Sequence, residues 1–220
     1  MNIDNIDLFI SQVHHRFSLL KAGIIFTNVA QRRIQLSLKL VKEFLPNIEY
    51  IIWIAPSNFL KTLKYTNEIK LNSQTFRHRI LYYSVETISV SDHKFLELYN
   101  IIHTHKTFCI MDEGLSIKNS EAQKTKRFLM LSEYFTYKLI LSSVPATQGL
   151  IDLYSQLKFL NRHLLKMNEK QFNNIFMKHT YQSYIIKRRW SRPQDEKKII
   201  EIMRPYILGY DLREKYITHH

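Results

Sequence analysis

Residues 108–119 read Phe-Cys-Ile-Met-Asp-Glu-Gly-Leu-Ser-Ile-Lys-Asn, and this stretch decides the fold. The apolar or near-apolar residues 107–111 lead directly into two adjacent carboxylates, Asp112 and Glu113. Such a run predicts a strand buried on both faces of a parallel sheet. Open α/β sheets bind their ligands at the carboxyl ends of strands, where this acidic pair is expected to lie. The alternative interpretation is that both acids are merely solvated or cap the next helix.

The pattern on either side of this stretch alternates between apolar runs and helical segments. Strands are predicted over residues 22–26, 50–55, 79–83, 107–111 and 137–142, and helices over 32–45, 58–69, 92–102, 121–131 and 150–160. Ser91 is expected to cap the helix that begins at residue 92. This alternation indicates an α/β fold, a mainly parallel sheet of six or seven strands with helices on both faces. We expect 50–55, 107–111 and 137–142 to be adjacent strands, with Cys109 buried.

Charge and composition restrict the class of partner. The 220 residues carry a net charge of +13, which favours an anionic partner, with nucleic acid before an anionic membrane. A merely basic, solvated surface is the alternative. The single cysteine fits a reducing, cytoplasmic location. The N-terminal residues contain two aspartates and no basic stretch, and no apolar run approaches the ~18 residues of a membrane span, so no membrane association is expected.

Taken together, the motifs resemble the first RecA-like lobe of Swi/Snf-type superfamily-two helicases, especially those found in phages and other mobile elements. Residues 112–119 resemble that family's Asp-Glu-Ala-His box with its trailing Ile-Lys-Asn, and residues 139–145 resemble its Leu-Thr-Gly-Thr-Pro motif. Residues 152–160 match the helix that follows, and residues 124–127 match a basic run. Residues 54–57 fall where the family has its first single-strand-contacting loop. The resemblance covers about residues 23–210 and implies a RecA-like fold.

Departures from the family pattern concern the nucleotide site. The positions of the glycine-rich phosphate loop are occupied by Val29, Ala30, Gln31, Arg32 and Arg33. Glycines are needed there because several backbone N–H groups must approach the phosphates. Arg33 also lacks the hydroxyl that helps to hold Mg²⁺. Gly114 and Leu115 replace the Ala-His of the acidic box.

These departures predict that the chain does not hydrolyse ATP and has no cofactor, and Mg-ATP is the alternative. Arg32, Arg33, Asp112 and Glu113 would then be vestigial, with Asp112 a metal ligand only if Mg²⁺ binds. The family's adenine-recognition segment is not recognisable before Gly23. The family's second lobe, which supplies arginines for phosphoryl transfer, is not recognisable after the first lobe either.

We expect residues 1–160 to form a degenerate RecA-like helicase lobe and residues 161–220 to form a small, helical, basic segment packed on the same domain. This segment carries 13 of the 32 Lys and Arg residues and only six acids. Helices are predicted over 171–178 and 196–203. Basic side chains pair with phosphates and an aromatic ring can stack on a base. The expected contacts to nucleic acid or to an acidic protein partner are Lys61, Lys187, Arg188, Arg189, Trp190 and Arg192. In the alternative, Trp190 anchors the segment to the core.

The leading functional hypothesis is an ATPase-inactive, single helicase-like lobe. It would bind DNA, or a protein of replication, recombination or host defence, in the cytoplasm of a host if it is phage-encoded. The first alternative is one subunit of a split Mg-ATP-dependent helicase or translocase, with the second lobe on another chain. The second is a protein-directed decoy that inhibits a host nuclease or defence system.

Overall fold

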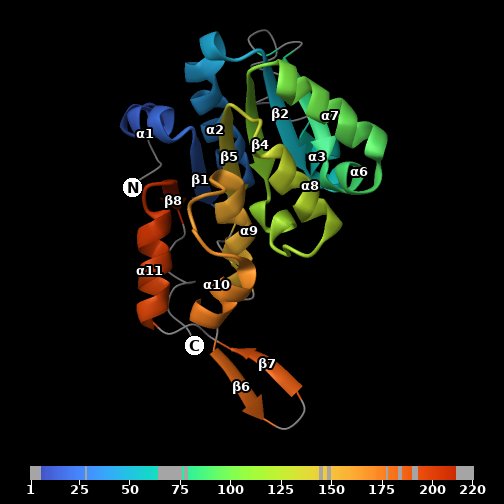
Figure 1. Ribbon diagram of the computed structural model, residues 1–220. Coiled ribbons are helices and arrows are strands. Elements are labelled where there is room, and N and C mark those ends of the chain that lie inside the picture. Colours follow the sequence, from blue (N-terminus) through green and yellow to red (C-terminus); the bar gives the residue numbers. More distant parts are fainter. Residues whose placement is uncertain are drawn as a thin grey trace.

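Six parallel strands form the central sheet of the protein (Figure 1). The computed structural model describes residues 6–27, 29–63, 76, 79–143, 146–147, 150–176, 178–182, 185–189 and 193–211. The strand order is β3-β2-β4-β5-β1-β8. The bounds are β1 Ala22–Thr27, β2 Tyr50–Ala55, β3 Ile80–Ser84, β4 Thr107–Asp112, β5 Tyr137–Ser142 and β8 Ile207–Asp211.

The predicted core of the sheet is confirmed. β2, β4 and β5 are neighbours, in the register that places Ile52 beside Cys109 and Ile110 beside Leu139. Cys109 is fully buried. The near-continuous apolar runs of these strands are explained by helices that cover both faces of the sheet, because every side chain then meets apolar neighbours.

Alternate residues of each strand belong to two separate apolar cores. In β4, Cys109 and Met111 join the core under helices α6 to α11, whereas Phe108 and Ile110 join the core under helices α1 to α3. The bounds of the helices on the first face are α6 Val85–Val90, α7 Asp92–Thr104, α8 Gln123–Leu131, α9 Ile151–Leu160, α10 Glu169–Phe176 and α11 Pro193–Met203. Those on the second face are α1 Ile6–Leu20, α2 Ala30–Phe44 and α3 Ser57–Leu63, and two short 3₁₀ helices are η1 Leu45–Asn47 and η2 Gly114–Ile117.

Local sequence signals explain several of these boundaries. Ser91 is the N-cap of α7 as predicted, and its Oγ accepts a hydrogen bond of 3.2 Å from the backbone N–H of Lys94. Ser84 caps α6 in the same way through the N–H of Thr87. Pro46 lies in η1, which ends α2. The expected helix over 58–69 is observed as α3 up to Leu63, and its remainder lies outside the described residues.

The C-terminal part contains more strand than the sequence predicted. Its helices are α10 and α11, but β6 Lys178–Gln182 and β7 Ile185–Arg189 form an antiparallel hairpin. The helices predicted over 171–178 and 196–203 correspond to α10 and α11, whereas the two strands between them were not predicted. Figure 1 shows this hairpin reaching away from the six-stranded sheet. The chain then returns through α11, and β8 pairs with β1 at the edge of the sheet.

The close approach of β8 to β1 depends on Gly23. A Cβ atom at this position would lie 2.5 Å from Cδ1 of Leu208, a side chain that is itself buried.

In the part of the chain that is described, no helix is long and apolar enough to cross a bilayer.

Candidate functional site

The carboxyl ends of β1, β4 and β5 bring the predicted acidic pair to one edge of the sheet. Phe26 of β1 is paired with Ser142 of β5, and Leu141 of β5 is paired with Asp112 of β4. The segments that leave these three strands therefore start side by side. This is the edge where open parallel sheets bind ligands.

The segment after β1, where the sequence analysis expected the phosphate loop, begins a helix directly. Oγ1 of Thr27 accepts a hydrogen bond of 3.2 Å from the backbone N–H of Val29. Val29 is the N-cap of α2, and the N–H of Arg33 already donates to the carbonyl of Val29 at 3.1 Å. Residues 30–33 thus form the first helical turn, with Arg32 half-buried on it. Every residue of this turn carries a side chain, so the turn contains none of the glycines that a phosphate loop requires.

Arg33 reaches from this turn to both acids. Its Nη1 lies 3.4 Å from Oδ1 of Asp112 and 3.4 Å from Oε2 of Glu113. The side chains of Arg33 and Asp112 are 9% and 2% exposed, whereas that of Glu113 is 33% exposed. The sequence analysis named Arg32, Arg33, Asp112 and Glu113 as vestigial residues of one nucleotide site, and the structure brings Arg33 to the two acids.

Burial has a strong effect on Asp112. Loss of solvation raises the pKa of its carboxyl to about 6, although the positive charge of Arg33 opposes this rise. Among the described residues, neither Oδ2 of Asp112 nor Nε1 of Trp53 has a hydrogen-bond partner of normal geometry, yet the indole is close enough to lower this pKa slightly. Asp112 is therefore a buried carboxylate whose charge is compensated chiefly by Arg33.

Glu113 turns the chain away from the strand. Its backbone is left-handed, with φ 64° and ψ 71°, a conformation that costs a non-glycine residue energy and that clusters at functional sites. Oγ of Ser143, just after β5, lies 3.4 and 3.5 Å from the two carboxylate oxygens of Glu113. The sequence had placed Ser143 in a family motif but had given it no partner.

Gly114 departs from the family's alanine for a visible steric reason. A Cβ atom there would lie 2.5 Å from Cγ2 of Ile140 and 2.7 Å from Oε1 of Gln156. Both neighbours are fully buried, so the chain packs η2 more tightly against β5 and α9 than an alanine permits.

The edge near β2 carries a contact that the sequence did not reveal. The backbone N–H and the Oγ of Ser57 both donate to Oε2 of Glu86, at 3.0 and 2.7 Å. This places an acid at the start of α3, within the loop expected to contact single-stranded nucleic acid. Glu86 lies in the first turn of α6, two residues after the end of β3, so the rule that functional groups gather at strand ends was a signal that could have found it. Lys61 is exposed on the same helix.

The remaining predicted contact residues lie close together in the C-terminal part of the sequence. Lys187, Arg188 and Arg189 belong to β7, while Trp190 and Arg192 lie outside the described residues.

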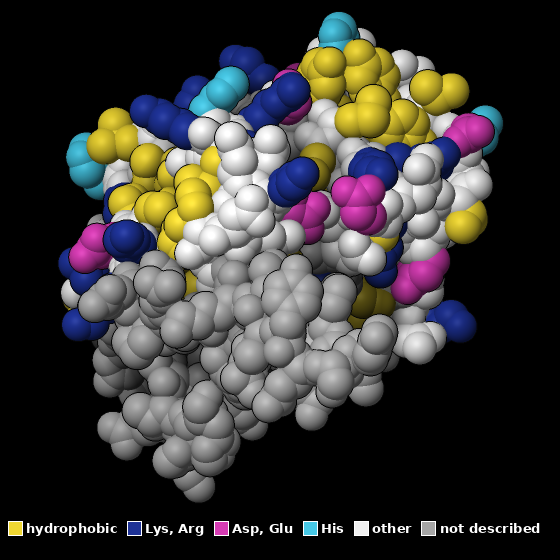
Figure 2. Space-filling model, turned by 60° about the horizontal axis from the view of Figure 1, so that its bottom comes forward, with side chains coloured by type: hydrophobic (Ala, Val, Ile, Leu, Met, Phe, Trp, Pro, Cys, Tyr) yellow, Lys and Arg dark blue, Asp and Glu magenta, His cyan; other side chains and the backbone are white. Residues whose placement is uncertain are grey.

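Arg127, in the basic run of α8, makes contacts within the protein. It pairs with Asp92 and donates a hydrogen bond of 2.9 Å to the carbonyl of Ile88. On the face that Figure 2 presents, Lys and Arg side chains alternate with acidic and apolar ones rather than forming one patch.

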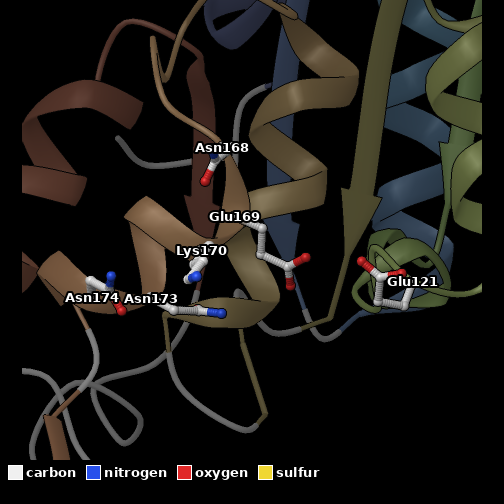
Figure 3. Close-up of a pocket in the computed structure, with 6 residues that line it drawn as sticks. All are labelled: Glu121, Asn168, Glu169, Lys170, Asn173 and Asn174. Atoms are coloured by element: carbon white, nitrogen blue, oxygen red, sulfur yellow. The ribbon is translucent and has the colours of Figure 1, made fainter.

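A hollow in the surface lies apart from the acidic pair. It has a volume of about 630 Å³ and is lined by polar residues of α10 and the loops before α8 and α10 (Figure 3): Glu121, Asn168, Glu169, Lys170, Asn173 and Asn174. Oγ of Ser120 donates to the carboxylate of Glu169 beside it. None of the predicted site residues lines this hollow.

The residues at the acidic pair do not fit a Mg-nucleotide. Mg²⁺ requires several oxygen ligands in near-octahedral geometry, but the group nearest both acids is a guanidinium. The first turn of α2 offers no glycine to bring its backbone onto phosphates.

Two comparisons with individual proteins agree with this architecture. A Sulfolobus solfataricus SWI2/SNF2 ATPase core, solved in complex with dsDNA, superposes with a TM-score of 0.70 over 91% of this chain and 42% of the other, at 15% identity. This likeness confirms the RecA-like fold. The TATA-binding protein-associated factor mot1 of Schizosaccharomyces pombe is 37% identical over 71 residues, which are 32% of this chain and 4% of that protein. The chain therefore spans less than half the length of each.

A family model supplies the assignment. The model of the SNF2-related domain matches residues 60–211, from α3 to the last strand of the sheet. This match includes the acidic pair, the segment after β5 and the basic hairpin. Because it extends over more than half of the residues, the chain belongs to the SNF2-related domain family.

Proposed function

We propose that this chain is a helicase-like lobe that binds duplex DNA through its basic C-terminal part and does not hydrolyse ATP. Its net charge of +13 supports an anionic partner. Its fold is that of an ATPase core solved with dsDNA, which makes duplex DNA the first partner to test.

The register of the β6–β7 hairpin carries the DNA-binding half of the proposal. Lys178 is paired with Arg189, His179 with Arg188, and Thr180 with Lys187. Lys178 and Arg189 are like-charged residues at directly opposite positions, which is unfavourable in a β-ladder, and an isolated two-stranded hairpin is marginal in water. A phosphate backbone would offset the excess of basic residues in this hairpin. A two-stranded ribbon is also narrow enough to enter the major groove of a duplex.

The start of α2 supports the second half of the proposal. Residues 29–33 begin a helix at the place where a nucleotide-binding loop would need glycines, and Arg33 is already paired with Asp112 and Glu113. An ATPase needs both the phosphate cradle and the metal. We therefore assign binding, and no turnover, to this lobe.

Duplex binding is tested by fluorescence anisotropy with a short labelled DNA, titrated between about 50 and 200 mM salt. The variant carries Lys187→Gln, Arg188→Gln and Arg189→Gln. Loss of three phosphate contacts should weaken binding to all sequences and flatten the plot of log affinity against log salt by about 2–3 units.

A charge-matched control comes from the opposite edge of the sheet. Lys21, Lys42 and Lys106 are exposed near the amino ends of β1 and β4 and at the end of α2. Their replacement by Gln removes the same charge and should change the slope by less than about one unit. If the wild type binds no duplex even at low salt, DNA binding is refuted. A protein complex that survives nuclease would then favour the decoy hypothesis.

The split-ATPase alternative rests on one observation, the persistence of Asp112 and Glu113 at the end of β4. It requires a second lobe on another chain. Mg²⁺-dependent hydrolysis that appears only when a partner is added, and that is lost in Asp112→Ala, would replace our proposal by this one.

A further inference from the structure

Arg33 lies between the two carboxylates at the centre of the site. One nitrogen, Nη1, is within 3.4 Å of an oxygen of each acid. Glu113 in turn accepts a hydrogen bond from Ser143. A single cation on α2 therefore connects the ends of β4 and β5 with the helix that follows β1.

The two acids need a positive charge whatever the chain binds. Asp112 is almost completely buried, and a buried carboxylate without a counter-charge is strongly destabilising. A guanidinium stays charged at every physiological pH and offers five donors in a fixed plane. The compensation provided by Arg33 is therefore permanent, unlike that of an ion which can dissociate.

We propose that Arg33 is a built-in cation that takes the place of a divalent metal at the Asp112–Glu113 pair. The chain thereby neutralises its own acidic pair and excludes Mg²⁺ from it. This inference deepens the ATP-inactive half of the proposed function and is independent of DNA binding.

Size and charge explain the exclusion. Mg²⁺ binds oxygen ligands at about 2.0–2.1 Å and demands nearly complete octahedral coordination. An ion placed between the two carboxylates would contact the guanidinium and be repelled by it. Removing the side chain of Arg33 should leave two neighbouring carboxylates and the space that it filled, with Oδ2 of Asp112 already lacking a hydrogen-bond partner among the described residues.

Terbium luminescence provides a direct test on the full chain. Tb³⁺ is a hard, oxygen-seeking cation, and Trp53 is close enough to Asp112 to sensitise its emission. The wild type, Arg33→Ala, Arg33→Gln and the double variant Arg33→Ala/Asp112→Asn are titrated with Tb³⁺. Lys42→Ala removes one positive charge from the exposed end of the same helix and serves as the control. Circular dichroism establishes that each variant is folded.

We expect no saturable emission from the wild type or from Lys42→Ala. Arg33→Ala should give saturable emission that excess Mg²⁺ competes away and that the double variant loses. Arg33→Gln keeps a shorter, neutral, polar side chain and serves as the second variant if Arg33→Ala does not fold. It should also give saturable emission that excess Mg²⁺ competes away. Emission from the wild type that depends on Asp112 overturns the proposal, and so does a folded Arg33 variant that remains silent.

Discussion

Asp112 and Glu113 are neighbours in sequence, but their environments differ sharply. Asp112 ends a strand and is 1% exposed, while Glu113 adopts a left-handed backbone and keeps a third of its side chain in solvent. The left-handed turn allows two successive carboxylates to reach the same guanidinium. It costs about 1–2 kcal/mol in backbone energy, which the ion pairs and the hydrogen bond from Ser143 offset.

The sequence predicted only part of this residue-scale arrangement. It located the acids at the end of a strand and placed Arg33 at a position of the phosphate loop. It interpreted Arg33 only as the loss of a hydroxyl group that would help to hold Mg²⁺. It did not predict the ion pair between Arg33 and Asp112. That contact joins residues 79 positions apart and depends on how α2 packs against the sheet, so no local pattern contains it.

Lys138 provides a pH-dependent prediction at the same scale. It lies near the start of β5, and burial lowers its pKa to about 8 from an unfolded value of 10.5. Between these values the unfolded chain binds more protons, so the contribution of Lys138 to stability should rise with pH by about 2–3 kcal/mol in total. In Lys138→Met this rise should be absent, and the variant should be more stable than the wild type near pH 7.

Urea unfolding at several pH values between about 7 and 10.5 measures the free energy of unfolding of the wild type and of Lys138→Met. The difference between the two removes the contributions of the other titrating groups, which both proteins share. Lys106→Met, an exposed position just before β4, is the control and should follow the wild type. Equal pH dependence in wild type and Lys138→Met would show that the buried ammonium group is fully solvated in the native state.

At the scale of elements, the alternating α/β pattern could be predicted because its signals are local. Five strands and the helices between them, with the exception of α6, follow from apolar runs and 3.6-residue periodicity. α1 was missed although Phe9, Ile10, Val13 and Phe17 form a helical apolar stripe. β8 and the hairpin could not be predicted because they contain few apolar runs, and β8 is defined by pairing with β1 from the distant start of the chain.

A variant of Arg127 can show whether the basic run of α8 has a structural role or a DNA-binding role. It donates to the carbonyl of Ile88, pairs with Asp92 and lies 5.2 Å above the ring of Phe95. Arg127→Met should lower the free energy of unfolding by about 1–2 kcal/mol, because α8 loses its tether to α6 and α7. The salt slope of DNA binding should not change.

The neighbouring Lys126 supplies the control for this prediction. It forms an exposed ion pair with Glu121, so Lys126→Met should alter stability by no more than about 0.5 kcal/mol. Chemical unfolding and the anisotropy titration are run on both variants. A flatter salt slope for Arg127→Met at unchanged stability would assign Arg127 to the DNA surface instead.

At the scale of the whole molecule, a net charge of +13 affects every experiment with an anion. Phosphates, nucleotides and DNA will all be attracted to the surface at low salt. Because this attraction is general, binding alone is weak evidence for a specific site. Dependence on Mg²⁺ and on Asp112 is the property that a nucleotide site has and a basic surface lacks.

This distinction defines the prediction for ATP. If the first turn of α2 and Arg33 exclude a metal-nucleotide, its dissociation constant should be weaker than about 1 mM, equivalent to −4.1 kcal/mol. At 1 mM ligand, binding of that strength stabilises a fold by about 0.4 kcal/mol or less, which moves the unfolding midpoint of a chain of this size by less than about 2 °C. Thermal unfolding in ATP with Mg²⁺, and in ATP with a chelator at equal ionic strength, should therefore coincide. Asp112→Asn should show the same small shift. A Mg²⁺-dependent shift of several degrees that Asp112→Asn abolishes, or phosphate release by the purified chain, would instead establish a working nucleotide site and favour the split-ATPase alternative.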